Sequence, residues 1–353
     1  MKFTSTAAVL LAAAFALPGY SKSESPAQKS AAAPLPSATS AITADDAAHF
    51  LAGLPVSGPL EPLTHTAAWR AHAAELDAAW QRMDTRQLAK VRAWAHGLPE
   101  PKSLFYFFSG PDFLYADQLF PAAKNYILCA IEPIGGVGDF QTLDEARLAA
   151  SLANLRQSMS SMLKFHYFIT KEMRADFVRD QLSGTLPILY VFLARTGHTI
   201  RSVTPVADGV KIDFSGGPAG RKTLHYFRTD LANGANNAAF FDFCRQYRGA
   251  GALLKSASYL LHEPGFSKCR DFLLQNTSAI LEDDSGIPFR DLTSKDWSTR
   301  LFGSYRGTEG TFAKYSQPDL LAAFRAEPPG PLGFAFGYQA QSEKACLILA
   351  TKR

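Results

Sequence analysis

The chain lacks the short motifs that mark the best-known catalytic and metal-binding sites. It contains no C-x-x-C, so neither a zinc clip nor a thioredoxin-type redox site is expected. No H-E-x-x-H occurs, and no two histidines are spaced four residues apart. A G-x-S-x-G elbow and a G-x-G-x-x-G phosphate loop are missing as well. The sequence therefore carries no complete catalytic signature and identifies no cofactor.

Excess charge of one sign is also lacking. The formal net charge is +4 over 353 residues, and no block of lysine and arginine stands out, which argues against a nucleic-acid partner. A repeat of 20–50 residues is missing, which excludes solenoids and propellers. With 47% hydrophobic and 19% charged residues, the composition is that of a globular protein.

The first 21 residues form the most informative segment and predict export. Lys2 supplies a positive start, Ala7–Leu17 is an apolar run, and Gly19-Tyr20-Ser21 offers small residues for cleavage. The run is too short for a comfortable membrane span, and no other stretch is long and apolar enough. We expect a chain that begins near Lys22, is periplasmic or secreted, and has no membrane span after cleavage. An uncleaved N-terminal anchor is the alternative.

Only four cysteines are present, and their state stays open. They are Cys129, Cys244, Cys269 and Cys346. An oxidising compartment would allow one or two disulfides, and four cysteines allow three full pairings. Cys129 and Cys346 each lie in an apolar, strand-like run, which fits buried free thiols at least as well.

Composition divides the chain into four parts. Residues 1–21 are the predicted signal peptide, and residues 22–43 form a linker rich in alanine, serine and proline. An N-terminal helical segment covers 44–98 and an α/β body covers 99–353. A change from helical to period-two patterning near residue 198 suggests a Rossmann-like half over 99–198 and a mixed half over 199–353.

The predicted fold class is α/β. Alternating strand, helix and strand patterns over 104–131 indicate a parallel, Rossmann-like core. Asp208-Gly209 is a strong hairpin signal for added antiparallel strands, and a long amphipathic helix is expected over 67–96. Further helices are expected over 143–168 (capped by Thr142), 171–181, 187–195, 238–247, 253–262, 266–275 and 318–325. Further strands are expected over 200–206, 210–214, 223–227, 279–282 and 297–305, with an antiparallel pair formed by 333–338 and 345–350.

The first candidate site comprises Ser109, Gly110, Asp112 and Glu132. The first three follow one predicted strand, and Glu132 ends the next strand, 20 residues after Asp112. This arrangement resembles the first half of a Rossmann-like nucleotide or S-adenosylmethionine site, in which such an acid accepts hydrogen bonds from a ribose. The turn has one glycine instead of three, and Asp112 would repel a diphosphate. The simpler interpretation makes Asp112 a helix-start acid and Glu132 a satisfied strand-end acid.

The second candidate site comprises Asp283, Asp284 and Ser285, which follow Glu282 at the end of a predicted strand. Consecutive acids can bind a hard cation or supply a general acid or base. Asp-Asp-Ser-Gly is also ordinary turn chemistry. Because strand ends share one edge of such a sheet, we expect both candidate sites to meet there.

Four segments resemble an uncharacterised group of bacterial exported proteins. They are residues 109–112, 132–133, 255–259 (Lys-Ser-Ala-Ser-Tyr) and 283–288 (Asp-Asp-Ser-Gly-Ile-Pro). The resemblance implies no activity, substrate or cofactor. Two functions remain compatible with the sequence. The first is an exported ligand-binding or non-catalytic protein with a degenerate Rossmann-like frame. The alternative is an exported hydrolase or transferase that uses an acidic, metal-assisted or metal-free pocket.

Overall fold

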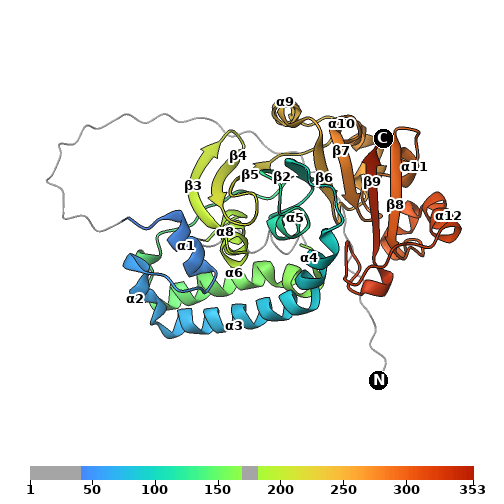
Figure 1. The fold of residues 1–353 in the computed structure, drawn as a ribbon. Helices are drawn as coiled ribbons and strands as arrows, with labels where there is room; N and C mark the ends of the chain where they lie inside the picture. The colour runs from blue at the N-terminus through green and yellow to red at the C-terminus, as the bar shows by residue number, and fades with distance from the viewer. Residues whose placement is uncertain (1–40, 169–181) are drawn as a thin grey trace, which may run out of the picture.

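A computed structural model describes residues 41–168 and 182–353 (Figure 1). The predicted signal peptide, most of the linker and the helix expected over 171–181 lie outside the described residues. In the part of the chain that is described, no helix is long and apolar enough to cross a membrane.

The architecture is built on one sheet of nine strands. In the order β3-β4-β5-β2-β1-β6-β7-β9-β8, every neighbour is hydrogen bonded. The strands are β1 (Ser103–Phe107), β2 (Asn125–Ala130), β3 (Thr199–Val206), β4 (Gly209–Ser215), β5 (Arg221–Arg228), β6 (Ala250–Leu254), β7 (Thr277–Glu282), β8 (Trp297–Gly303) and β9 (Cys346–Lys352).

The centre of the sheet is parallel and its two edges are antiparallel. Strands β5, β2, β1, β6 and β7 run in the same direction. Numbered among themselves along the chain, these five strands have the order 3-2-1-4-5 of a Rossmann fold. The β3–β4 hairpin extends one edge, and β9 and β8 extend the other. The predicted α/β, Rossmann-like class with added antiparallel strands is confirmed.

Helices cover both faces of this sheet (Figure 1). They are α1 (Ala44–Leu51), α2 (Glu61–Thr64), α3 (Ala67–Met83), α4 (Ala89–Ala95), α5 (Phe113–Leu119), α6 (Glu145–Phe165), α8 (Leu186–Arg195), α9 (Ala238–Cys244), α10 (Ser267–Asn276), α11 (Phe289–Leu292) and α12 (Pro318–Ala326). Two hydrophobic clusters result, one on each face.

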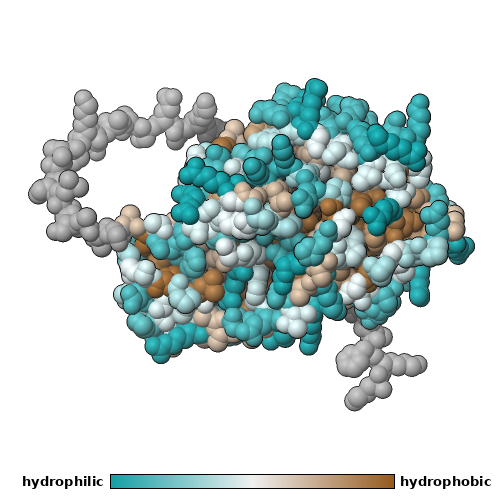
Figure 2. All heavy atoms as spheres, in the orientation of Figure 1, coloured by the Kyte–Doolittle hydropathy of each residue, from teal (hydrophilic) through white to brown (hydrophobic). Residues whose placement is uncertain are grey.

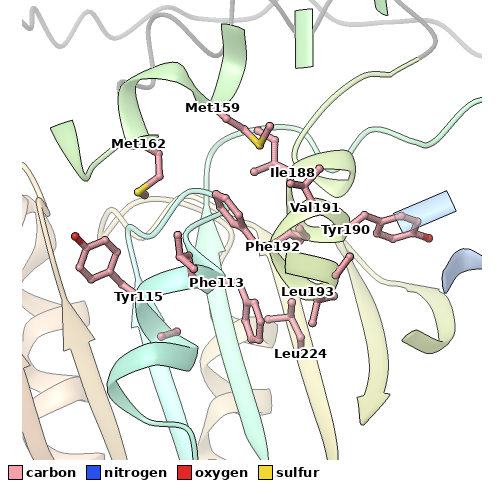
Figure 3. Packing of buried hydrophobic residues seen from close by; sticks show 14 of the residues in the cluster. Phe113, Tyr115, Met159, Met162, Ile188, Tyr190, Val191, Phe192, Leu193 and Leu224 are labelled. Carbon is pink, nitrogen blue, oxygen red and sulfur yellow. The ribbon is translucent and has the colours of Figure 1, made fainter. Parts of the chain in front are cut away.

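Strand β1 shows how the sequence divides between the two clusters. Leu104 and Tyr106 belong to one cluster, whereas Phe105 and Phe107 belong to the other, as period-two alternation requires. All four side chains are buried, as expected for the central strand of a covered parallel sheet. Figure 3 shows the first cluster, where side chains of α5, α6 and α8 pack together against the sheet.

The long N-terminal helix is present but is not a uniform α-helix. A five-residue π turn, Asp84–Leu88, joins α3 to α4. The predicted apolar stripe faces the core, with Leu76, Met83 and Val91 buried. Helix α3 packs along α6, and the two lie side by side below the sheet in Figure 1. The stripe therefore serves packing.

The helix predicted over 253–262 is wrong, because its first residues belong to a strand that ends at the candidate site. Residues 250–254 form β6, which is buried at every position and pairs with β1 and β7. The run Ala-Gly-Ala-Leu-Leu is short and apolar, so its periodicity does not separate strand from helix. The two neighbouring strands provide hydrogen-bond partners for its backbone amide and carbonyl groups. A loop from Lys255 to Tyr259 follows.

Two smaller predictions are also wrong. The expected pairing of 333–338 with 345–350 does not form, because β9 pairs with β7 and β8 instead. Helix α6 begins after Asp144, whose side chain accepts a hydrogen bond from the Arg147 amide, and not after Thr142. The hairpin predicted at Asp208-Gly209 forms, with Gly209 as the first residue of β4, opposite Val206.

A candidate small-molecule pocket at the strand ends

A cavity of about 140 Å³ lies at the carboxyl ends of the parallel strands. Four of these strands lead into segments that line the cavity: Ser109 and Gly110 come shortly after β1, Glu132 after β2, Asp230 after β5 and Lys255 directly after β6. Strand β2 lies on one side of β1 and β6 on the other. The cavity therefore occupies the topological switch point, where ligands bind in open α/β sheets.

The floor of the pocket is a buried ion pair. Lys255 Nζ lies 2.8 Å from Asp112 Oδ2, and both side chains are almost fully buried. The same carboxylate accepts hydrogen bonds from the Tyr106 hydroxyl at 2.7 Å and from the Tyr115 amide at 3.1 Å. Lys255 also donates to the His166 carbonyl oxygen at 2.6 Å. Asp112 is thus a structural anchor with both carboxylate oxygens engaged.

This anchor changes what the start of α5 can bind. In a dinucleotide site, the amides at the start of the corresponding helix face a diphosphate. Here the Asp112 side chain caps α5 by accepting the Tyr115 amide hydrogen. The helix start is already complemented by a carboxylate, which agrees with the simpler sequence interpretation of Asp112 as a helix-start acid.

The turn between β1 and α5 has an unusual backbone. Phe108 and Gly110 have φ angles of +59° and +55°. Only glycine adopts such angles readily, so Phe108 stores strain of the kind found at binding sites. The Ser109 amide is fixed by the Cys129 carbonyl oxygen, 3.2 Å away, and its hydroxyl donates to the Gly110 carbonyl oxygen.

Two acids that come shortly after β2 and β5 also line the pocket. Glu132 is 2% exposed and Asp230 is exposed at the rim. Ile131, which precedes Glu132 in the chain, is 45% exposed. On the face of the molecule that Figure 2 shows, hydrophilic residues cover much of the surface and hydrophobic residues form smaller patches. Aromatic rings complete the walls; Phe108 and Phe266 meet edge to face, with ring centres 5.9 Å apart.

The second candidate site does not line this pocket. Asp283, Asp284 and Ser285 lie behind the loop that follows β6 and bind its backbone and side chains. Asp283 Oδ2 accepts the Ser256 amide hydrogen at 3.1 Å, and Asp284 Oδ2 accepts the Tyr259 hydroxyl at 2.7 Å. The structure therefore connects the two predicted sites through the 255–259 loop, whose Lys255, Ser256 and Ser258 line the cavity.

The 255–259 loop needs this support because its backbone is strained. Ser256, Ser258 and Tyr259 all have φ near +56°. Each such residue costs about 1–3 kcal/mol unless its surroundings impose the conformation. Ser285 supplies part of that constraint, since its Oγ accepts the Ala257 amide hydrogen at 2.8 Å and its carbonyl oxygen accepts the Tyr259 amide hydrogen.

The carboxylate of Asp284, which supports this loop, is buried and lies next to a second carboxylate. Burial, together with the adjacent Asp283 charge, raises the pKa of Asp284 to about 7. Burial likewise raises the pKa of Asp283 and of the neighbouring Glu282. Perturbed carboxylates of this kind mark functional sites as well as structural networks.

We predict that Asp284→Asn stabilises the protein above pH 7. Unfolded aspartate loses its proton near pH 3.8, whereas Asp284 in the folded chain keeps its proton up to about pH 7. Between these values the folded state binds more protons, so stability falls as pH rises and stays low above pH 7. Asparagine removes this penalty and retains an acceptor for Tyr259. Denaturant unfolding at pH 8 should show a gain of more than about 1 kcal/mol.

The matched control for this prediction is Asp296→Asn, which replaces an exposed aspartate. It should change the free energy of unfolding by less than about 0.5 kcal/mol at either pH. Equal stabilisation of both variants at pH 5 and pH 8 would mean that Asp284 is not responsible.

The four cysteines are all free and buried in the structure, so none of the three possible pairings forms. Burial raises the pKa of Cys129, the only cysteine that lines the described pocket. Such a thiol is unreactive. Within residues 41–168 and 182–353, no three histidine, cysteine, aspartate or glutamate side chains are grouped closely enough to hold a metal ion.

Sequence reasoning missed two charged residues of the pocket. The helix expected over 253–262 takes in Lys255 and hides its position at a strand end, and Asp230 stands in no recognised motif. Lys255 directly follows β6, and Asp230 comes shortly after β5, as Glu132 does after β2; that position is the signal in the sequence that could identify them. Tyr338, which also lines the cavity, donates its hydroxyl to the Ser256 carbonyl oxygen at 2.8 Å. No local pattern connects Tyr338 with a segment 82 residues earlier.

Comparison with known proteins adds no functional information. No protein family matches the chain, and no curated protein matches it. Among solved structures, a soaked form of RebC is 9% identical and aligns over 72% of this chain and 47% of that one. The TM-score of 0.12 for this alignment is too low to support an argument about the fold.

Proposed function

We propose that this chain is an exported, small-molecule-binding protein whose ligand lies over the carboxyl ends of β1, β2 and β6. The observation that carries this proposal is the convergence of residues from four parallel strands on one cavity at the switch point. Its volume of about 140 Å³ is close to that of an engineered cavity that binds benzene. One ring of a ligand can therefore be enclosed, while the remainder occupies the mouth.

The chemistry of the lining favours binding over catalysis. Nucleophilic catalysis needs a nucleophile beside a general base. Asp112 is fully engaged by Lys255, Tyr106 and the Tyr115 amide. Cys129 has a raised pKa, and no histidine occurs among the described residues that line the cavity. The described pocket thus supplies recognition groups without an evident nucleophile–base pair.

We predict that a ligand of this pocket raises the melting temperature of the wild-type chain but not of Thr229→Trp. Thr229 lines the cavity and is half-buried, so an indole there fills the mouth without entering the core. A ligand that binds only the native state must stabilise it by mass action, by about 2.7 kcal/mol at 100 times Kd. A thermal-shift screen of a metabolite library measures this. Equal shifts in both proteins would refute the pocket as the binding site.

The alternative, an exported hydrolase or transferase, has one specific observation in its favour. Asp284 has a pKa of about 7 and lies beneath a strained loop, which are properties of a general acid or base. Asp284 does not line the cavity, however, and its carboxylate is engaged by Tyr259. A catalytic role would require the loop to move, so we place this function second.

Export is part of the same proposal and is tested separately. Lys2 and the Ala7–Leu17 apolar run support a cleaved signal peptide. We predict that mass spectrometry of the protein recovered from the periplasm or medium will give an N-terminus near Lys22. Recovery of the protein only in cytoplasmic fractions, or with Met1 retained, would contradict this prediction.

A further inference from the structure

We propose that the 255–259 loop is a pH-sensitive gate of the switch-point cavity, closed in mildly acidic solution and open at and above neutral pH. The gate goes beyond the proposed function, since it concerns access to the cavity and not the identity of a ligand. Three features carry it: a strained loop that lines the cavity, two buried carboxylates that bind this loop, and half-exposed aromatic rings that pack on Tyr259.

The loop is held in a conformation that its residues do not favour. Ser256, Ser258 and Tyr259 have φ angles of +56°, +56° and +57°, where residues with side chains rarely lie. The Ser256 hydroxyl oxygen is buried and has no hydrogen-bond partner in the described structure. A buried polar atom without a partner is unfavourable, and strained backbone is typical of segments that switch between two arrangements. A modest loss of support would therefore let the loop adopt a second arrangement.

Hydrogen bonds to Asp283 and Asp284 supply the support. Asp283 Oδ2 accepts the Ser256 amide hydrogen at 3.1 Å, and Asp284 Oδ2 accepts the Tyr259 hydroxyl at 2.7 Å. Asp283 Oδ1 also accepts the amide and the hydroxyl of Ser285, at 3.1 and 2.6 Å. Hydrogen bonds favour the charged form of a carboxylate. Because Asp284 accepts fewer of them in the described structure, it is the acid of the pair that holds a proton more readily.

Ionisation of Asp284 places a second negative charge in a buried site. Burial, together with the adjacent Asp283 charge, raises the pKa of Asp284 to about 7. Burial lowers the pKa of His262 to about 4, so this ring is neutral near pH 7, and Lys255, which faces Asp283, is paired with Asp112. The titratable groups of the described chain that face Asp284 are Glu282 and Asp283 on its own segment, Tyr259 and His262 after β6, Tyr305 after β8, and Cys346 in β9.

Opening of the loop would hydrate Asp284. The Tyr259 ring, whose hydroxyl binds Asp284, lies face to face with the ring of Tyr315, with ring centres 4.8 Å apart and an angle of 2° between the planes. Tyr315 and Phe312 belong to a short 3-10 helix, η7 (Gly310–Tyr315), and both are half-buried. Tyr259 therefore lies close to the surface, and its displacement would let water reach Asp284. The same movement would displace the part of the cavity wall that this loop forms.

The direction of the pH effect follows from where the proton is held. In the open loop Asp284 is hydrated, so its pKa returns toward the ordinary value of 3.8. Between 3.8 and about 7 the closed loop holds a proton that the open loop has lost. Rising pH therefore favours opening in this range, by about 10-fold per pH unit. Above about pH 7 both forms are ionised, and the effect levels off.

Hydrogen exchange of the full mature protein tests the gate without a ligand. The amides of Ser256, Ala257 and Tyr259 are all hydrogen bonded, so they exchange only when the loop opens. After correction for the intrinsic pH dependence of exchange, the opening equilibrium of a peptide that covers the loop should rise roughly 100-fold between pH 5 and pH 8. Asp284→Asn should remove this rise, whereas the exposed control Asp296→Asn should keep it.

Access to the cavity is measured by alkylation of Cys129, which lines it. At pH 8, Cys129 should react with iodoacetamide at least about 10-fold faster in the wild-type chain than in Asp284→Asn, because only the wild-type loop is opened by the additional charge. Comparison at one pH keeps the ionisation of the thiol the same in both proteins. Cys269 is buried and does not line the described cavity, so in the wild-type chain it should react more slowly than Cys129.

The outcomes separate the gate from the proposed function. If loop exchange has the same pH dependence in Asp284→Asn, or rises only together with the exchange of β1, which reports global unfolding, the gate is wrong. If loop exchange behaves as expected but Cys129 reacts equally fast in both proteins, the loop moves without opening the cavity, and the gate is again wrong. The proposed function fails on its own test, when a ligand raises the melting temperature of the wild-type chain and of Thr229→Trp equally.

Discussion

Replacing Lys255 with methionine should lower the free energy of unfolding by about 3–5 kcal/mol. Its ammonium group lies 2.8 Å from the Asp112 carboxylate, and the two side chains are only 1–2% exposed. Removing one partner of a buried pair leaves the other charge uncompensated, which accounts for losses of this size. Lys255 also donates to the His166 carbonyl oxygen and lies over the Tyr115 ring, 4.2 Å from its centre. Urea unfolding at pH 7 measures the effect.

Two further variants show whether the buried charge is the cause. Lys211→Met removes a pair with Asp213 in which both side chains are more than a third exposed, so the loss should stay below about 1 kcal/mol. Adding Asp112→Asn to Lys255→Met should recover part of the lost stability, because no unpaired carboxylate remains. If the double variant is less stable than Lys255→Met by the full cost of Asp112→Asn, the two residues are independent and the ion pair is unimportant.

Replacing Gly337 with alanine should lower the free energy of unfolding by about 3 kcal/mol or more. Gly337 has a φ of +64°, which costs a residue with a side chain about 1–2 kcal/mol. A methyl group there would also come within 1.8 Å of Asp283 Oδ2. The Asp283 carboxylate is buried and accepts the Ser256 amide hydrogen, so moving it would release the 255–259 loop. Thermal and urea unfolding measure the loss.

Gly220 provides a matched control for this substitution. Its φ of +67° is nearly the same, but a methyl group there would meet no atom within 4 Å. Gly220→Ala should therefore cost only the backbone term of about 1–2 kcal/mol. The difference between the two variants isolates the steric conflict with Asp283. Equal losses at the two positions would show that a methyl group at position 337 does not disturb Asp283, and that the 255–259 loop does not depend on this contact.

Local patterns in the sequence were sufficient to predict the fold class. Three local signals agree with the structure. The apolar run at 104–108 contains most of strand β1, the Asp208-Gly209 turn lies in the β3–β4 hairpin, and the helical spacing of Leu76 and Met83 places both in the core. Strand β6 was missed because five small apolar residues fit a strand or a helix equally. Its neighbours, which lie about 150 residues upstream and 25 downstream, decide the matter.

The candidate site is only partly predictable, because some of its contacts join residues that are far apart in the sequence. Ser109, Gly110, Asp112 and Glu132 were found because each follows a strand that local patterning identifies, and all four line the cavity. Asp283 and its neighbours were also placed after a strand. Their role as supports of another loop depends on contacts with Ser256 and Tyr259 that no spacing reveals.

We expect the switch point between β1 and β6 to hold a small molecule. The most direct test is to soak crystals of the mature protein with a diverse set of small fragments and determine where they bind. We expect bound fragments between Ile131, Ser109 and Lys255, with one ring enclosed by the cavity. Fragments that gather elsewhere, while the protein's own side chains fill this cavity, would show that the switch point is not a binding site.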